Sequence, residues 1–312
     1  MSFRCIAAFA LVVAAAAATT TTIETQARNK RIVIIAGRPS HPAGMHEFRA
    51  GSLLLQKALS GVKGITVDVI PMGWPKKTVD GKEVDDNAAL DGADAVFIYA
   101  DGGRGHPAIQ NDRVQVIDAL AKKGVGLGFG HYGVEVPVGE PAAAMHRWVG
   151  GYYETDYSVN PMWAPKFANF PSHPVTRGVG PFSNNDEWYF NMRWTPDEKL
   201  KSRIVPLLVD TPGEDVRDGP YVSPPGPYAH IIADKGRAET LMWVFERPDG
   251  GRSFGFTGGH THTNWGDANQ RRIVLNALLW IAKVDVPRGG VVDTITADDL
   301  TVNLDPKPPR RQ

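Results

Sequence analysis

Apolar segments that take turns with helical patterns run through most of this chain and limit the folds open to it. In the first half, four segments are apolar at most of their positions and are predicted to be strands. Strands of this kind are buried on both faces, as in parallel sheets covered by helices. The predicted strands occupy residues 31–36, 64–70, 93–100 and 125–129.

Helical spacing follows the first and third of these strands. Residues 46–59 carry Phe48, Leu54 and Leu55 at helical intervals, and residues 111–124 begin with capping residues and end at a glycine. A chain in which buried strands are separated by helices forms a mostly parallel central sheet with helices on both faces. The sequence therefore predicts an α/β fold of three layers.

The pattern loosens between residues 135 and 200, a region rich in Pro, Trp, Tyr and Asn, and then returns. The aromatic-rich region is expected to be an insertion over the active face of one domain that spans residues 28–286. Residues 287–312, with prolines and basic residues near the end, are expected to form an extended tail outside the core. Four further strands are predicted at residues 203–210, 229–234, 239–247 and 252–259. A hairpin turn is predicted at residues 248–251 and a helix at residues 267–284.

The N-terminal segment has the layout of a secretory signal peptide. Arg4 precedes an apolar run over residues 5–18, which is followed by small and polar residues. The run is shorter than the roughly 20 residues that span a bilayer, so we expect cleavage near residue 27 and no stable membrane span. The mature protein is expected in the periplasm or outside the cell. It would contain no thiolate, because Cys5 is the single cysteine.

The charge balance bears on the partner. Formal net charge is zero and the pI is about 7.1, so a basic stripe for nucleic acid is not indicated. No nucleotide cofactor is expected either. A small molecule is the favoured ligand.

Histidines gather where the predicted strands end. Six of the nine lie on the loops that follow four strands, and these loops meet at one edge of a parallel sheet, where ligands bind. A single loop histidine is usually a cap or a surface group, but independent loops have no structural reason to share a residue type. The six are His41, His46, His106, His131, His260 and His262.

Three roles fit converging imidazoles. They can bind Zn²⁺ or a similar divalent metal with a nearby carboxylate, act as general acid and base, or hydrogen-bond the hydroxyl groups of a sugar. His260 and His262 would share a face if their segment were extended. Neither an HExxH nor a CxxC spacing is present.

Other polar and aromatic residues are candidates for substrate contact. Asp101 and Arg104 follow the third strand, and aromatic residues between polar ones suit stacking against a sugar ring. Core packing and a surface for a protein partner are the competing explanations for the aromatic residues. The candidates from the aromatic segments are Glu187, Trp188, Tyr189 and Trp265.

Six short motifs in a fixed order resemble the ThuA-like, or trehalose-utilisation, family over about residues 30–285. After His46, they are "GFGHYGVE" (128–135), "RWVGGYYE" (147–154), "SHPVTRGV" (172–179), "DEWYF" (186–190), "GRSFGFTGGHTHTNW" (251–265) and "NALLW" (276–280). The resemblance implies a flavodoxin-like fold similar to class I glutamine amidotransferases, whose elbow carries a cysteine nucleophile. Here His131 stands at the elbow and His260 on the later catalytic loop. Without a thiolate, glutaminase chemistry is excluded.

The resemblance also implies a sugar substrate, because the family is associated with trehalose and related disaccharides and with 3-keto-sugar intermediates. We expect an exported carbohydrate-active enzyme that uses acid–base or metal-assisted elimination, hydration, isomerisation or hydrolysis. The candidate catalytic residues are His131, His260 and Glu187, and the candidate metal ligands are His46, His131, His260 and His262. The alternatives are a non-catalytic sugar-binding or scaffold protein and a metal-dependent esterase or amidase.

Overall fold

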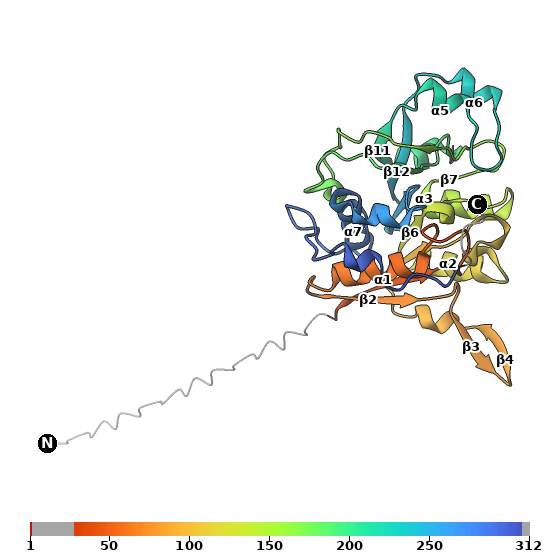
Figure 1. The fold of residues 1–312 in the computed structure, drawn as a ribbon. Coiled ribbons are helices and arrows are strands. Elements are labelled where there is room, and N and C mark those ends of the chain that lie inside the picture. Colours follow the sequence, from red (N-terminus) through yellow and green to blue (C-terminus); the bar gives the residue numbers. More distant parts are fainter. Residues whose placement is uncertain (2–27, 308–312) are drawn as a thin grey trace.

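The computed structural model describes residue 1 and residues 28–307, and the predicted signal peptide lies outside this part of the chain. The described residues contain a seven-stranded sheet with the strand order β11-β12-β13-β6-β5-β1-β2 (Figure 1). Its strands are β1 (Lys30–Ala36), β2 (Ile65–Ile70), β5 (Ala95–Tyr99), β6 (Gly126–Gly130), β11 (Ile204–Asp210), β12 (Glu239–Glu246) and β13 (Arg252–Phe256).

Five neighbouring strands of the sheet, from β13 to β2, are parallel. This order is the flavodoxin-like one, so the predicted α/β fold is confirmed. β12 and β11 continue the sheet as antiparallel strands, and β12 and β13 form the hairpin that residues 248–251 predicted. Among the described residues, no helix is long and apolar enough to span a membrane.

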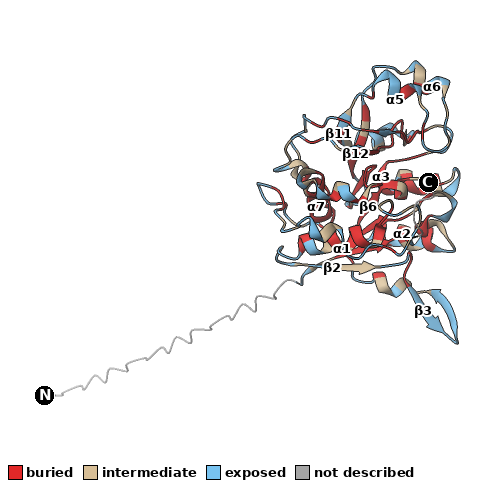
Figure 2. Ribbon diagram, viewed as in Figure 1, coloured by how far each residue is buried: buried red, intermediate tan, exposed pale blue. Residues whose placement is uncertain are grey.

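Helices cover both faces of the sheet. Ile32 and Ile34 of β1 belong to a core with α1 (Phe48–Leu59) and α7 (Ala268–Ile281). Val33 and Ile35, which point the other way, belong to a second core. That core includes residues of α2 (Arg113–Lys122) and α3 (Glu140–Val149). Figure 2 shows the buried residues gathered on the sheet and on the helix sides that meet it.

Shorter elements connect these layers. A hairpin of β3 (Lys76–Val79) and β4 (Lys82–Asp85), which the sequence did not predict, projects from the body (Figure 1). The other short strands are β7 (Gly151–Tyr152), β8 (Met162–Trp163), β9 (Asp186–Glu187) and β10 (Arg193–Trp194), and the short α-helices are α4 (Glu198–Lys201), α5 (Glu214–Asp218) and α6 (Ala229–Ala233). The 3-10 helices are η1 (Asn87–Leu90), η2 (Gly103–Gly105), η3 (Pro107–Ile109), η4 (His131–Val134), η5 (Pro174–Thr176), η6 (His262–Gly266) and η7 (Asp298–Leu300).

The strand predicted at residues 229–234 is wrong, because this segment forms the helix α6. Ile231 is fully buried, and its amide donates to the carbonyl of Tyr228 in a helical turn. A run with only two branched apolar residues fits one turn of helix as well as a strand.

The prediction that residues 287–312 lie outside the core is also wrong for part of the segment. Val291 is 2% exposed and belongs to the core under α7. Its amide donates to Oδ1 of Asn276 at 2.9 Å, and Asn276 is itself fully buried on α7. The composition of this segment does not reveal that Val291 is buried, because that burial depends on its contact with α7.

Glycines in β6 allow the layers to approach. A Cβ added to Gly126 would lie 2.1 Å from the carbonyl oxygen of Ile281 at the end of α7. A Cβ added to Gly128 would lie 2.5 Å from the ring of Phe254. The glycines of the "VGLGFG" segment therefore serve close packing of helix and rings against the central strand.

We predict that Gly126→Ala lowers the free energy of unfolding by about 1–3 kcal/mol, because the added methyl group meets backbone that cannot move aside cheaply. Chemical denaturation measures the change. Gly61→Ala is the control, since nothing lies within 4 Å of a Cβ at that position and the change should be small. Equal stability of the two variants would contradict the packing described for β6.

Candidate functional site

Four parallel strands end in one row and bring their loops together. The register pairs the last residues of these strands with one another, namely Ala36, Tyr99, Gly130 and Phe256. The loops that follow carry His46, Asp101, His131 and His260, as the sequence predicted. β9 adds Glu187 from the aromatic-rich region. The resulting cluster of possible ligands is His46, His131, Glu187 and His260.

The ligand atoms of this cluster lie very close to one another. His46 Nε2 is 3.0 Å from His131 Nε2 and 3.0 Å from His260 Nδ1. The His131 and His260 atoms are 3.2 Å apart. Glu187 Oε2 lies 2.7 Å from His260 Nδ1 and 3.5 Å from His131 Nε2. All four residues are at most 4% exposed.

Outer partners fix which ring nitrogens carry hydrogen. His46 Nδ1 lies 2.8 Å from Asp101 Oδ1, and His131 Nδ1 lies 3.0 Å from the carbonyl oxygen of Thr257. Because both oxygens accept, these Nδ1 atoms donate, and in the neutral rings the Nε2 atoms carry lone pairs. Two lone pairs that face each other at 3.0 Å repel unless a proton or a metal ion lies between them.

The arrangement fits a tetrahedral metal. Four donors at 2.0–2.1 Å from Zn²⁺ are separated by about 3.3 Å. Five of the six separations here run from 2.7 to 3.5 Å, and all four atoms lie within 4.8 Å of one another. A carboxylate or a carbonyl behind each ligating histidine is the usual outer shell of such sites. The three imidazoles and Glu187 can therefore hold a divalent ion of the zinc type.

The electrostatics of the cluster point the same way. Burial opposes ionisation of Glu187, but hydrogen bonds to His131 and His260 outweigh the burial and lower its pKa to about 2. Burial lowers the pKa of His46 far below its ordinary value. Burial also disfavours the charged form of His131, but its interactions with Glu187 raise the pKa above the usual value. The buried carboxylate thus attracts one positive charge into the cluster.

The loops of the site are held against one another. The amide of His46 donates to the carbonyl of His260 at 3.0 Å, and Met45 forms a bridge with Thr261. Asp186 accepts from the amides of Gly259 and Thr261 at 2.7 and 2.9 Å. These bonds fix the segments that carry His46 and His260.

Three histidines of the site have left-handed backbone conformations. The φ angles of His41, His46 and His131 are 61°, 47° and 49°. Residues with a Cβ pay a steric penalty there, and such strain gathers at functional sites. For His131 it matches the sharp turn at which related folds present a catalytic group.

A pocket of about 340 Å³ opens beside the cluster. His46 and Glu187 reach its wall, and a loop at residues 222–224 forms another part of the lining. Other polar residues that line it are His41, Tyr132, Glu135, Asn160 and Tyr189. The pocket can place a small polar molecule against the ligand cluster.

Glu135 is the pocket carboxylate outside the ligand cluster. Burial raises its pKa to about 7, although a hydrogen bond from Thr155 Oγ1 at 3.0 Å partly opposes this. Nearby Glu187 raises the pKa further and His131 lowers it. Burial also raises the pKa of Tyr132 to about 12, so its hydroxyl group stays protonated.

Several sequence-predicted residues lie at the site. Asp101 orients His46, and Tyr189 lines the pocket with its hydroxyl group 3.3 Å from His131 Nε2. Asn160, which the sequence did not single out, donates to Glu187 Oε1 at 2.8 Å.

Four predicted site residues do not fit their expected roles. His262 lies outside the ligand cluster, because its segment turns into η6 and is not extended. Trp188 and Trp265 are fully buried among other aromatic rings and cannot stack on a sugar. Arg104 is exposed and does not line the pocket.

The residues that the sequence missed carry weak signals. His41 was among the clustered histidines without an assigned role, and Glu135 closes the "GFGHYGVE" segment only four residues after His131. A residue that follows an elbow so closely is a reasonable candidate for the same pocket. Asp186 and Asn160 act through loop contacts that no local pattern predicts.

Comparisons with known proteins agree with the fold. A family model described as ThuA, trehalose utilisation, matches residues 60–281. A ThuA-like protein from Bacteroides uniformis has a similar structure, with a TM-score of 0.56 and 15% identity over 83% of this chain and 94% of its own. An exo-β-1,4-mannosidase from an Opitutaceae bacterium reaches a TM-score of 0.36 at 12% identity, over 81% of this chain and 36% of its own. A search of curated proteins gave no match.

His106 has a structural role that yields a pH prediction. It is fully buried, its Nδ1 accepts from the amide of Ala108, and its Nε2 donates to the carbonyl of Gly133. Burial lowers its pKa to about 4, against 6.5 in the unfolded chain. The unfolded state therefore binds this proton first, and stability falls as pH drops from about 6.5 to about 4.

We predict that His106→Asn makes the free energy of unfolding less dependent on pH in this window, by up to one proton, or about 1.4 kcal/mol per pH unit. Urea titrations at several pH values measure the slope. His230→Asn, at an exposed position, is the control and should keep the slope of the wild type. An unchanged slope in the His106 variant would show that other groups cause the acid sensitivity.

Proposed function

The chain belongs to the ThuA, or trehalose utilisation, family, and we propose that it is a metal-dependent enzyme that moves a proton next to a carbonyl group of a sugar. The observation that carries the proposal is the convergence of three imidazoles and one carboxylate beside a pocket that holds a further carboxylate. The three imidazoles and their carboxylate suit a metal ion, and the further carboxylate in the pocket is free to carry a proton.

The proposed ligands are His46, His131, His260 and Glu187. A divalent cation bound there would polarise a carbonyl group and stabilise the negative charge that develops on its oxygen. In this proposal the candidate catalytic residues His131, His260 and Glu187 are metal ligands. Another residue must therefore carry the proton. Asp101 holds the ring of His46 in the required tautomer.

Glu135 is the proposed base. Its carboxylate takes the proton from the carbon next to the carbonyl group. The electron pair of that C–H bond forms a C=C bond while the carbonyl π pair moves to oxygen, which gives an enediolate. If the hydroxyl proton on the carbon that lost its hydrogen moves to the former carbonyl oxygen, and Glu135 returns its proton to the former carbonyl carbon, the sugar is isomerised. If the carbon on the far side of the abstracted proton carries a glycosidic oxygen, the carbonyl bond re-forms, the C=C bond shifts to that carbon, and its C–O bond breaks. Glu135 then gives the proton to the leaving alcohol.

The size and lining of the pocket support a sugar of one ring in the deepest part. A volume of about 340 Å³ lies at the low end for small-molecule sites. The hydroxyl groups of a sugar could bond to hydroxyl and amide groups in the lining, which belong to Tyr132, Asn160 and Thr155. The second ring of a disaccharide or glycoside would extend past the loop at residues 222–224. A 3-keto-glycoside has both the acidic C–H and the leaving group that this chemistry needs.

We also propose that the protein works after export, in the periplasm or outside the cell. The support is the layout of the first 27 residues, with Arg4 before an apolar run.

We predict about one tightly held divalent ion per chain, and its loss in His131→Ala and in His260→Ala, because each substitution removes a quarter of the ligand set. Elemental analysis of purified protein measures the ion. His262→Gln is a matched control, since it changes a buried histidine only two residues from His260 but outside the ligand cluster. Wild-type protein that stays metal-free after incubation with Zn²⁺, Mn²⁺ or Co²⁺ would refute the metal-dependent mechanism.

We predict that Glu135→Gln retains the metal but loses at least a hundredfold in the rate at which a 3-keto-disaccharide exchanges its acidic C–H with D₂O, because an amide cannot take the proton. Proton NMR measures the exchange. The wild-type rate should rise with pH through about 7, as Glu135 loses its proton.

The control for this experiment is Glu198→Gln, which changes an exposed glutamate. The wild-type rate tests the proposed function, and the rate of Glu135→Gln tests whether Glu135 is the base. No exchange by metal-loaded wild type would count against the proposed chemistry, whereas exchange that survives in Glu135→Gln would assign the proton transfer to another group such as His41.

A further inference from the structure

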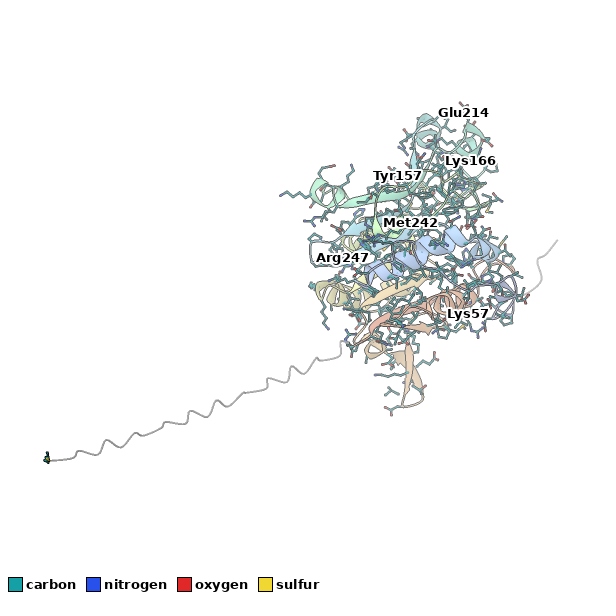
Figure 3. All side chains as sticks on the ribbon, turned by 90° about the vertical axis from the view of Figure 1, so that its left-hand side faces the viewer. Lys57, Tyr157, Lys166, Glu214, Met242 and Arg247 are labelled. Carbon is teal, nitrogen blue, oxygen red and sulfur yellow. The ribbon has the colours of Figure 1, made fainter. Side chains whose placement is uncertain are left out.

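The C-terminal segment at residues 299–307 runs along α1; the course of the chain can be followed in Figure 1. Asp299 Oδ1 lies 2.5 Å from Nζ of Lys57, which is labelled in Figure 3. Further along, the carbonyl of Asn303 accepts from Arg49 at 3.1 Å. We call residues 299–307 the C-terminal strap. Its contacts move from the end of α1 to its beginning as the chain proceeds.

The last described residues of the strap reach Glu47 in the interior. The amide of Asp305 donates to Glu47 Oε2 at 2.8 Å, and Lys307 Nζ lies 3.3 Å from Glu47 Oε1. The side chains of Lys307 and Glu47 are 2% and 1% exposed. A buried ion pair is costly to assemble and costly to break on one side, so its place in the fold is specific.

The residues that the strap holds are the two neighbours of His46. Lys307 Nζ also donates to the carbonyl of Met45, and Glu47 Oε1 accepts from the amide of Gly44 at 2.9 Å. His46 lies between Met45 and Glu47 with a φ angle of 47°. The strap therefore holds the residues on both sides of His46, whose strained backbone must keep Nε2 of the ring directed at the cluster.

We infer that Lys307 is a positioning residue for His46, and that the C-terminal strap keeps this histidine in its ligating conformation. The inference rests on the proposed function only where it speaks of ligation, because Lys307 bonds to Met45 and Glu47 and not to a residue of the cluster. A residue with positive φ relaxes unless its surroundings hold it, and Lys307 supplies bonds on both sides.

Hydrogen exchange in the metal-free protein tests the positioning role. The amides of Gly44, Met45 and His46 are all hydrogen-bonded, so they exchange slowly while the loop is held. In Lys307→Met, we expect exchange in residues 44–47 to rise at least tenfold, with the strands of the central sheet unchanged. Chelator competition should show at least tenfold weaker Zn²⁺ retention.

A second variant guards against simple unfolding. Lys307→Met leaves the charge of Glu47 buried and unpaired, whereas Lys307→Met combined with Glu47→Gln removes both charges and should regain thermal stability. The double variant should still exchange faster in residues 44–47, because the bond to the Met45 carbonyl is missing. Lys201→Met, which changes an exposed lysine that pairs with Glu198, is the control.

The outcomes separate the two proposals. Unchanged exchange at residues 44–47 in a folded variant would overturn the positioning role, whatever the metal result. A uniform rise across the whole chain would overturn it too, since that pattern describes general destabilisation. Faster exchange at this loop in protein that binds no metal would uphold the strap and count against the proposed function alone.

Discussion

The structure of the active face depends on one contact, the carboxylate of Glu187 buried against three imidazole rings. A buried negative charge is stable only with a positive partner, and here the nearest candidates are the rings themselves or an ion held by them. The surrounding loops serve this contact. Asp186 holds the segment of His260, Asp101 orients His46, and the carbonyl of Thr257 orients His131, so each donor atom faces the same point.

That convergence requires strained backbone at several residues. The free energy gained by packing the core offsets the cost of this strain. Each left-handed residue costs of order 1–3 kcal/mol, and His41, His46 and His131 are three such residues on two loops. The strands before these loops are buried on both faces and end in register, so the loops start from rigid points. Strain of this kind persists only where the neighbouring structure leaves no alternative.

The sequence predicted the sheet and the convergence of most residues of the cluster, because both follow from local pattern plus one topological rule. Apolar strands separated by helices place His46, His131 and His260 at one sheet edge, whatever the details of their loops. The predictions that failed concern features that local pattern does not determine. Whether Trp188 faces a pocket or the core, and whether His262 shares a face with His260, depends on loop conformation. The burial of Lys307 depends on a contact across 260 residues of chain, which no window of sequence contains.

The elbow places the proposed metal ligand and the proposed base on different residues of one turn. The turn after β6 directs His131 into the cluster with His46, His260 and Glu187. The chain then continues through η4, and Glu135 emerges on the pocket wall beside Thr155. Gly102 permits this path, since a Cβ there would lie 2.0 Å from the carbonyl oxygen of Tyr132. One short turn thus delivers an imidazole to the cluster and a carboxylate of raised pKa to the pocket, the arrangement that the proposed proton transfer needs.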